Sequence, residues 1–136
     1  MADGKLNETY KDWLQLADQD FGFASASLVE ELGYLGLICF HFQQAAEKYL
    51  KAYIVAHGLD FKKIHELPSL LQVCMNHDKE FGSLAQLCEF LTEFYVEARY
   101  PALLPDQYTK ELAREAQEKA REVKNFVEKK LDLNSF

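Results

Sequence analysis

Five polar residues within segment 40–53 are the first candidates for chemistry in this chain. The segment lacks Gly and Pro and is rich in good helix formers, which predicts a helix. At about 100° per residue, five polar residues gather on an arc of roughly 120° opposite a broad apolar arc. This polar stripe consists of His41, Gln44, Glu47, Lys48 and Lys51. A Lys ammonium group can supply a point charge for a phosphate. The same stripe can also be a solvated face with a Glu47–Lys51 ion pair, worth about 0.3–0.5 kcal/mol.

A central helix and its neighbours must position this stripe. The apolar arc is too wide for a surface helix, so residues 35–57 are expected to run through the centre of the fold. In the preceding segment, apolar residues recur every three or four positions. A first helix is therefore predicted to begin near Asn7 or Thr9 and to stop at Gly33. The short link 33–34 makes these two helices antiparallel neighbours.

Three further helices are predicted after the central one. Pro68 suits the first turn of a short helix, and His65 lies at its entrance, where the ring could bond the backbone. Residues 83–86 read as a capping box for a fourth helix. That helix is expected to end at Tyr100, because the residue before a proline avoids the helical region. A last helix between residues 112 and 131 alternates an apolar face with dense Glu, Lys and Arg.

These patterns predict the fold class. The sequence contains no alternating strand pattern, no Gly-rich loop and no internal repeat. The expected fold is all-α, in one domain spanning residues 1–136. It is an up-and-down antiparallel bundle of about five helices, four long and one short.

Three segments, in the expected order, resemble signature motifs of the HEPN domain family. The first has a His, a Gln pair, then Glu-Lys and Lys-Ala: His41, Gln43–Gln44, Glu47–Lys48 and Lys51–Ala52. The second is a His-acidic-Leu step with paired leucines in 65–71, and the third is 95–101. The resemblance covers residues 40–101, and the flanking helices fit by pattern only. It implies a HEPN-like bundle, suspected nucleotide binding and a homodimer paired through central helices. It also implies a frequent partner, a minimal nucleotidyltransferase, in a two-component or toxin–antitoxin-like pair.

The ribonuclease motif of the family is incomplete. Many HEPN proteins are metal-independent ribonucleases that use an Arg and, after four to six intervening residues, a His. Arg99 occupies a fitting place, but the positions for the His are Leu104, Pro105 and Asp106, and no His follows Arg99. The chain is therefore interpreted as a non-catalytic module. The alternative is a ribonuclease toxin in which another acid–base group, such as His41 or His65, acts with Arg99.

A phosphate or nucleotide site is the remaining hypothesis for the polar residues. Guanidinium suits a bidentate phosphate contact, and an aromatic ring could stack on a base. The expected ligand-binding residues are His41, Gln44, Lys48, Lys51, Tyr95, Arg99 and Tyr100. Alternatively, Arg99 pairs internally with Glu47 or Glu97 and fixes helix packing. Glu47 and His65 are expected to be structural polar residues.

Composition limits the other classes of function. The chain has 136 residues, and its formal charge of −7 disfavours a dedicated nucleic-acid binder. Cys39, Cys74 and Cys88 lack metal-ligand spacing and lie among apolar residues, as expected for buried, reduced thiols. No long uncharged apolar run or signal peptide is present. We therefore expect a cytoplasmic protein without a metal site, a cofactor or a strong nucleic-acid patch.

Overall fold

The computed structural model describes residues 9–61, 66–95 and 108–131, which form five α-helices and one 3₁₀ helix. No strand occurs in these three ranges. The elements are α1 Tyr10–Val29, α2 Leu35–Ala56, α3 Leu67–His77, η2 Lys79–Leu84, α4 Ala85–Thr92 and α6 Lys110–Lys130. The prediction of an all-α antiparallel bundle is confirmed.

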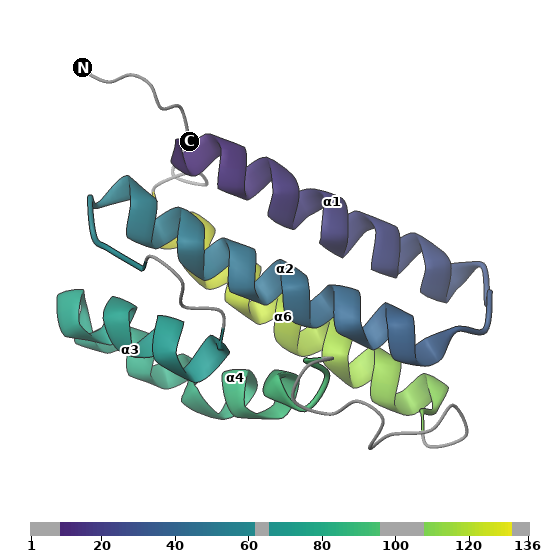
Figure 1. Cartoon of the computed structure of the whole chain (residues 1–136). Helices are drawn as coiled ribbons and strands as arrows, with labels where there is room; N and C mark the ends of the chain where they lie inside the picture. The colour runs from purple at the N-terminus through teal and green to yellow at the C-terminus, as the bar shows by residue number, and fades with distance from the viewer. Residues whose placement is uncertain (1–8, 62–65, 96–107, 132–136) are drawn as a thin grey trace.

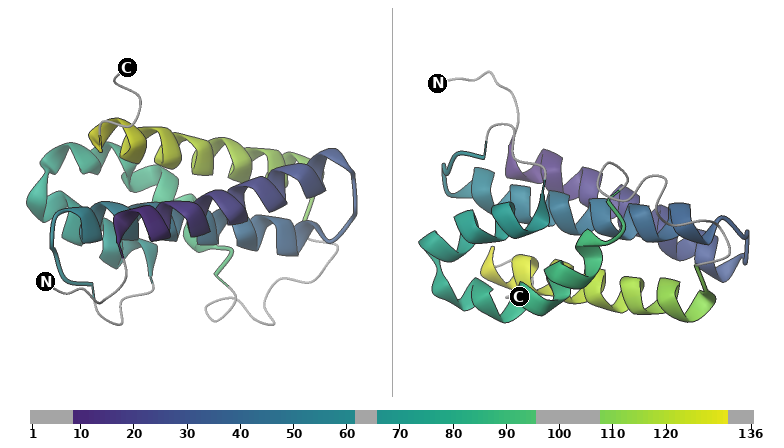
Figure 2. Two further views of the ribbon diagram at one scale, coloured as in Figure 1. Left: turned by 90° about the horizontal axis from the view of Figure 1, so that it is seen from above. Right: turned by 60° about the horizontal axis from the view of Figure 1, so that its bottom comes forward.

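Helix α2 is the centre of the bundle. It packs against α1, α3, α4 and α6, and α1 runs antiparallel beside it while α3 and α4 lie on its other side (Figure 1). The view from above in Figure 2 places α6 alongside the antiparallel hairpin that α1 and α2 form. Between Phe42 and Ile54 only Gln44 and Lys48 are not fully buried. The predicted central position of this helix is therefore confirmed, and its polar stripe must lie largely inside the protein.

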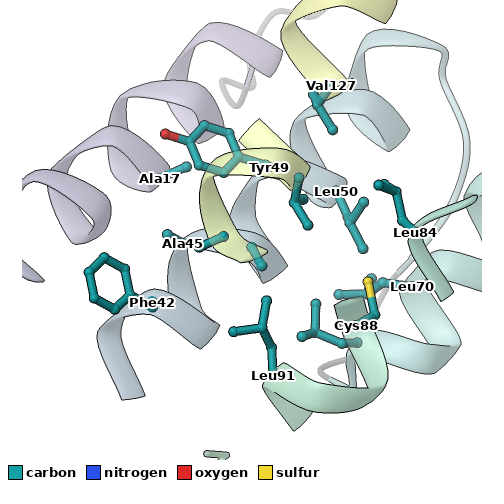
Figure 3. Packing of buried hydrophobic residues seen from close by; sticks show 14 of the residues in the cluster. Ala17, Phe42, Ala45, Tyr49, Leu50, Leu70, Leu84, Cys88, Leu91 and Val127 are labelled. Carbon is teal, nitrogen blue, oxygen red and sulfur yellow. The ribbon is translucent and has the colours of Figure 1, made fainter. Parts of the chain in front are cut away.

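The hydrophobic core surrounds α2 on several sides. Figure 3 shows Leu50 near Leu70 and Cys88, where α2 meets α3 and α4. Cys39, Cys74 and Cys88 are all buried as predicted, and burial raises the pKa of each thiol to about 12. The described helices include none that is both long enough and apolar enough to span a membrane.

The start of α1 confirms one predicted cap. Thr9 Oγ1 accepts a hydrogen bond from the Asp12 backbone N–H at 3.2 Å, and the Asp12 carboxylate accepts one from the Thr9 N–H at 2.9 Å. These reciprocal bonds form a capping box that satisfies two otherwise unpaired donors. The helix ends at Val29, four residues before the predicted stop at Gly33, which has a φ of 92° in the following turn.

The prediction for α4 is wrong at both ends. Leu84 precedes α4 without a side-chain cap, because residues 79–84 already form a 3₁₀ helix that is capped by the Asp78 carboxylate. Helix α4 is also short and ends at Thr92, well before Tyr100. The next backbone bonds, from the N–H of Phe94 to the Leu91 carbonyl and from Tyr95 to Thr92, have the tighter i→i+3 spacing that closes a helix. The structure therefore describes three long α-helices, α1, α2 and α6, where four were predicted.

Candidate functional site

Asp20 on α1 binds two residues of the polar stripe at once. Its Oδ1 lies 2.9 Å from His41 Nδ1, and its Oδ2 accepts a hydrogen bond from Lys48 Nζ at 2.6 Å. The side chains of His41 and Lys48 remain 27% and 23% exposed, while Asp20 is 13% exposed. We call these three residues the Asp20 cluster. It joins α1 to α2 while leaving two functional groups in partial contact with solvent.

The Asp20 cluster fixes the orientation of the His41 ring. An ionised carboxylate only accepts hydrogen bonds, so Nδ1 carries the proton and Nε2 is the nitrogen left for other contacts. The rings of Phe23 and Phe40 lie edge-on to the imidazole, with centroids 5.0 and 5.5 Å away. A carboxylate that holds Nδ1 is the arrangement by which general-base histidines are oriented in enzymes. His41 is therefore the best-positioned acid–base group among the predicted site residues that the structure describes.

The Glu47–Lys51 pair forms as predicted, but it is buried. Lys51 Nζ lies 2.9 Å from Glu47 Oε2, and the two side chains are only 5% and 6% exposed. The ammonium group also lies 5.1 Å from the Trp13 ring centroid and 5.3 Å from that of Phe61. The expectation of a solvated face is therefore wrong for this pair, because α1 and the chain after α2 cover it. Its aromatic neighbours favour the cation through their ring faces.

Gln44 connects the two halves of the stripe. Its side-chain amide donates to Gln43 Oε1 at 2.8 Å and to Glu47 Oε1 at 3.3 Å. The two lysines contribute two positive charges, and their partners Asp20 and Glu47 contribute two negative charges. The charges of the two lysines and of their two partners therefore cancel, which offsets the attraction of this region for a phosphate.

The other predicted site residues divide between described and undescribed segments. Tyr95 follows α4 and is partly buried. Arg99, Tyr100 and His65 lie outside the described residues, as do the positions 104–106 where the ribonuclease His would be required. The convergence of Arg99 with helix α2 stays a prediction.

A second polar contact between the same helices was not predicted. Tyr49 is buried and donates its hydroxyl to Asp18 of α1. Burial, and then the Asp18 carboxylate, raise the pKa of Tyr49 far above its ordinary value. Lys124 of α6 lies 6.0 Å from the Tyr49 ring centroid. Tyr49 belongs to the apolar arc of the predicted helix, and its position one turn from Ala45 gives no signal of a polar partner.

Two histidines come together at the far end of α2. The rings of His57 and His77 lie 4.6 Å apart, and His77 Nδ1 is 2.7 Å from the Tyr53 hydroxyl. Partial burial, followed by the neighbouring His77, lowers the pKa of His57. No set of three metal-ligating side chains is grouped in the described part of the chain.

Comparison with known proteins decides the family. The HEPN domain profile matches residues 10–130, nearly the whole chain. This chain belongs to the HEPN domain family. The HEPN fold also appears in two similar solved structures. One is ST0689, an archaeal HEPN homologue, with 26% identity and a TM-score of 0.73, covering 90% of this chain and 98% of that one. The other is TT1696 from Thermus thermophilus, with 30% identity and a TM-score of 0.74, covering 89% and 97%.

The HEPN assignment confirms the resemblance that three short motifs carried. No curated protein matches this chain. The function of this HEPN domain must therefore be argued from its own residues.

Proposed function

We propose that this HEPN domain is a non-catalytic interaction module. It pairs with a second copy of itself and with a minimal nucleotidyltransferase, in a two-component or toxin–antitoxin-like system. The observation that carries the proposal is a set of large apolar side chains on the α1–α2 hairpin that are 43–77% exposed. This hairpin patch consists of Leu16, Phe23, Val29, Leu32, Tyr34 and Leu37.

The hairpin patch is confined to one part of the described structure. All the large apolar side chains that are strongly exposed in the described residues belong to one hairpin. Phe23 contacts the His41 ring, and Leu37 lies one turn before His41 on α2, so the patch extends across both helices. Single exposed apolar residues need no explanation, but a concentration of them marks an interaction surface.

The turn that joins the two helices has an unusual backbone. Glu31 and Tyr34 adopt left-handed conformations, with φ of 55° and 31°, although neither is glycine. Such strain persists only where surrounding contacts hold it. Lys110 Nζ, on α6, lies 2.7 Å from Glu31 Oε1. On the other side of the turn, the Tyr108 ring packs against Gly36, so that a Cβ added to Gly36 would lie only 2.8 Å from a carbon of the ring. Contacts that restrain the backbone on both sides of Tyr34 lower the entropy cost of binding through this turn.

Self-association can be tested by light scattering. We expect the wild-type chain to exceed its monomer mass of 15.7 kDa at high micromolar concentration. Phe23→Glu with Leu37→Glu should remain monomeric, because four charges at a symmetric interface would be buried. Asn125→Asp, at an exposed position on α6, is the control with an added charge outside the patch. A wild-type chain that stays at its monomer mass would contradict self-association.

The nucleotidyltransferase partner can be tested by co-purification. The neighbouring open reading frame should be co-expressed with the wild-type chain and with the patch variants. Co-purification of a nucleotidyltransferase with the wild type supports this part of the proposal. Its absence from both the neighbouring frame and the purified complex would remove that support.

Nucleotide binding is a second candidate, favoured by the partial exposure of His41 and Lys48 beside the Phe23 ring. Asp20 competes with any phosphate for both groups, so binding would depend on the cation contributed by Arg99. Calorimetry with ATP and GTP on the wild type and on Arg99→Ala tests this candidate. Binding that disappears in the variant supports it, whereas no heat from either protein rejects it.

The ribonuclease alternative depends on the same cluster. Asp20 orients His41 as a general base requires, although the positions after Arg99 where the family has its His hold other residues. Cleavage of RNA by the pure wild-type chain, lost in both His41→Ala and Arg99→Ala, would overturn the non-catalytic interpretation.

A further inference from the structure

A groove with a volume of about 420 Å³ separates α3 from α4. It belongs neither to the Asp20 cluster nor to the hairpin patch. Its floor is apolar and contains Leu71, Met75 and Cys88. Gln72, Gln86 and Glu89 line it from exposed positions on the two helices.

The charge at the rim identifies the kind of partner. Among the residues that the structure describes, Glu89 is the only charged one that lines the groove. No ion pair joins its carboxylate to another described residue. The whole chain carries a formal charge of −7. A partner with a Lys or Arg beside its apolar residues would therefore meet complementary charge at Glu89.

The shape of the groove favours a helix over a small molecule. The walls are two helices, and α3 contributes residues 68, 71, 72 and 75, which form one helical face. A third helix packs naturally into such a furrow through i, i+3, i+4 and i+7 anchors. Small-molecule pockets instead bury most of the ligand against a few convergent polar groups. Here the polar lining residues are all exposed at the rim.

We propose that the α3–α4 groove binds a short amphipathic helix of another protein, with an apolar stripe in the groove and a basic residue at Glu89. This inference rests on the proposed function as an interaction module. Met75 suits the role because its flexible thioether side chain adapts to different apolar partners. Figure 1 shows α3 and α4 on the opposite side of α2 from α1. The groove and the hairpin patch can therefore be occupied at the same time.

The test uses three synthetic helical peptides and the full-length chain. One peptide carries a leucine stripe flanked by lysines, the second the same stripe flanked by glutamates, and the third the lysines without the stripe. Binding is followed by amide chemical-shift changes in labelled protein. We expect only the first peptide to bind, with changes concentrated in residues 68–75 and 85–89. Its affinity should fall as the salt concentration rises, because a rim charge steers the encounter.

Two variants and one control complete the experiment. Glu89→Lys should weaken the first peptide about fivefold or more and reverse the salt dependence, since salt would then screen a repulsion instead of an attraction. Met75→Gln keeps the side-chain length but should weaken binding at all salt concentrations. Glu122→Lys, an exposed position on α6 with the same charge change, should leave binding unchanged.

Three outcomes would overturn the inference. Equal binding of the glutamate-flanked peptide would show that Glu89 does not select the partner. Shifts confined to the hairpin patch would place peptide binding elsewhere. Shifts at residues 68–75 that depend on protein concentration without peptide would show a second copy of the chain in the groove. Light scattering of the patch variants reports separately on the proposed self-association, so the two ideas can fail independently.

Discussion

Two charged contacts on α2 lie within three turns of each other and differ in their environment. Glu47 and Lys51 are buried with Trp13 and Phe61 around the ammonium group. The Asp20 cluster, in contrast, leaves His41 and Lys48 about a quarter exposed. A buried ion pair is costly to break because one charge is left without water or a partner. A half-exposed contact can exchange its partner for water, so the proposed nucleotide binding depends on this region rather than on the buried pair.

The largest effect is expected from breaking the buried pair. Glu47→Leu removes the carboxylate that lies 2.9 Å from Lys51 Nζ and leaves a buried ammonium group. The free energy of unfolding should fall by about 3–5 kcal/mol in urea denaturation followed by circular dichroism. The double variant Glu47→Leu with Lys51→Leu should recover most of the loss, because the buried ammonium group that the single variant strands is also removed. A single-variant loss below about 1 kcal/mol would mean that Lys51 reaches water, and the contrast would disappear.

A smaller loss is expected at the Asp20 cluster. Asp20→Asn keeps the side-chain shape but removes the negative charge shared by His41 and Lys48. Because both partners are partly solvated, the free energy of unfolding should fall by only about 1 kcal/mol. Calorimetry should also show tighter binding of ATP than in the wild type, since the competing carboxylate is gone.

Glu30→Gln, an exposed change of the same charge on the α1 C-cap, is the control for Asp20→Asn. It should alter neither stability nor ATP binding. A loss for Asp20→Asn as large as that for Glu47→Leu would erase the distinction between the two regions.

The pH dependence should come from the histidine pair at the other end of α2. The pKa of His57 is lowered in the folded chain by burial and by His77, so the unfolded chain binds the proton more readily. The stabilising contribution of neutral His57 is therefore present above the ordinary His pKa of about 6.5. It decreases as pH falls below that value and through the lower folded pKa.

Melting curves between about pH 5 and 8 should show this trend in the wild type and a flatter one in His57→Gln. Asp20→Asn should keep the wild-type trend if the histidine pair is its source. An unchanged slope in His57→Gln would assign the pH dependence to another group.

The smallest effect is expected at an exposed pair on α6. Arg121 Nη1 lies 2.6 Å from Glu118 Oε2, and the two side chains are 39% and 65% exposed. Glu118→Gln should change the free energy of unfolding by less than about 0.5 kcal/mol, because water and salt screen the pair. A loss above about 1 kcal/mol in urea denaturation would show that ion-pair energy here does not follow burial.

The sequence was sufficient to predict α2, its central position and the Glu47–Lys51 contact. These features depend on helical periodicity and on i,i+4 spacing, which are local properties of the chain. The Thr9 cap was predictable for the same reason. The burial of the pair was not, because it depends on Trp13 and Phe61, which lie far from it in the sequence.

The partners across helices were missed for a related reason. Placing Asp20 opposite His41 and Lys48 requires the register between α1 and α2, which the short turn alone does not determine. The limits of α4 were missed because Asp78 begins a 3₁₀ helix earlier in the chain, which removes the need for a cap at Ser83. The start of α4 was therefore decided by competition between the 3₁₀ helix and an α-helix for the same residues.

The central claim, that the hairpin patch is an interaction surface, is tested most directly by hydrogen–deuterium exchange at two protein concentrations. The most informative amides are those of residues 30–34, which lie in the turn between two stable helices. We predict slower exchange there at high micromolar than at low micromolar concentration, with no concentration dependence in the turn of Phe23→Glu with Leu37→Glu. Identical exchange of the wild-type turn at both concentrations would contradict the claim.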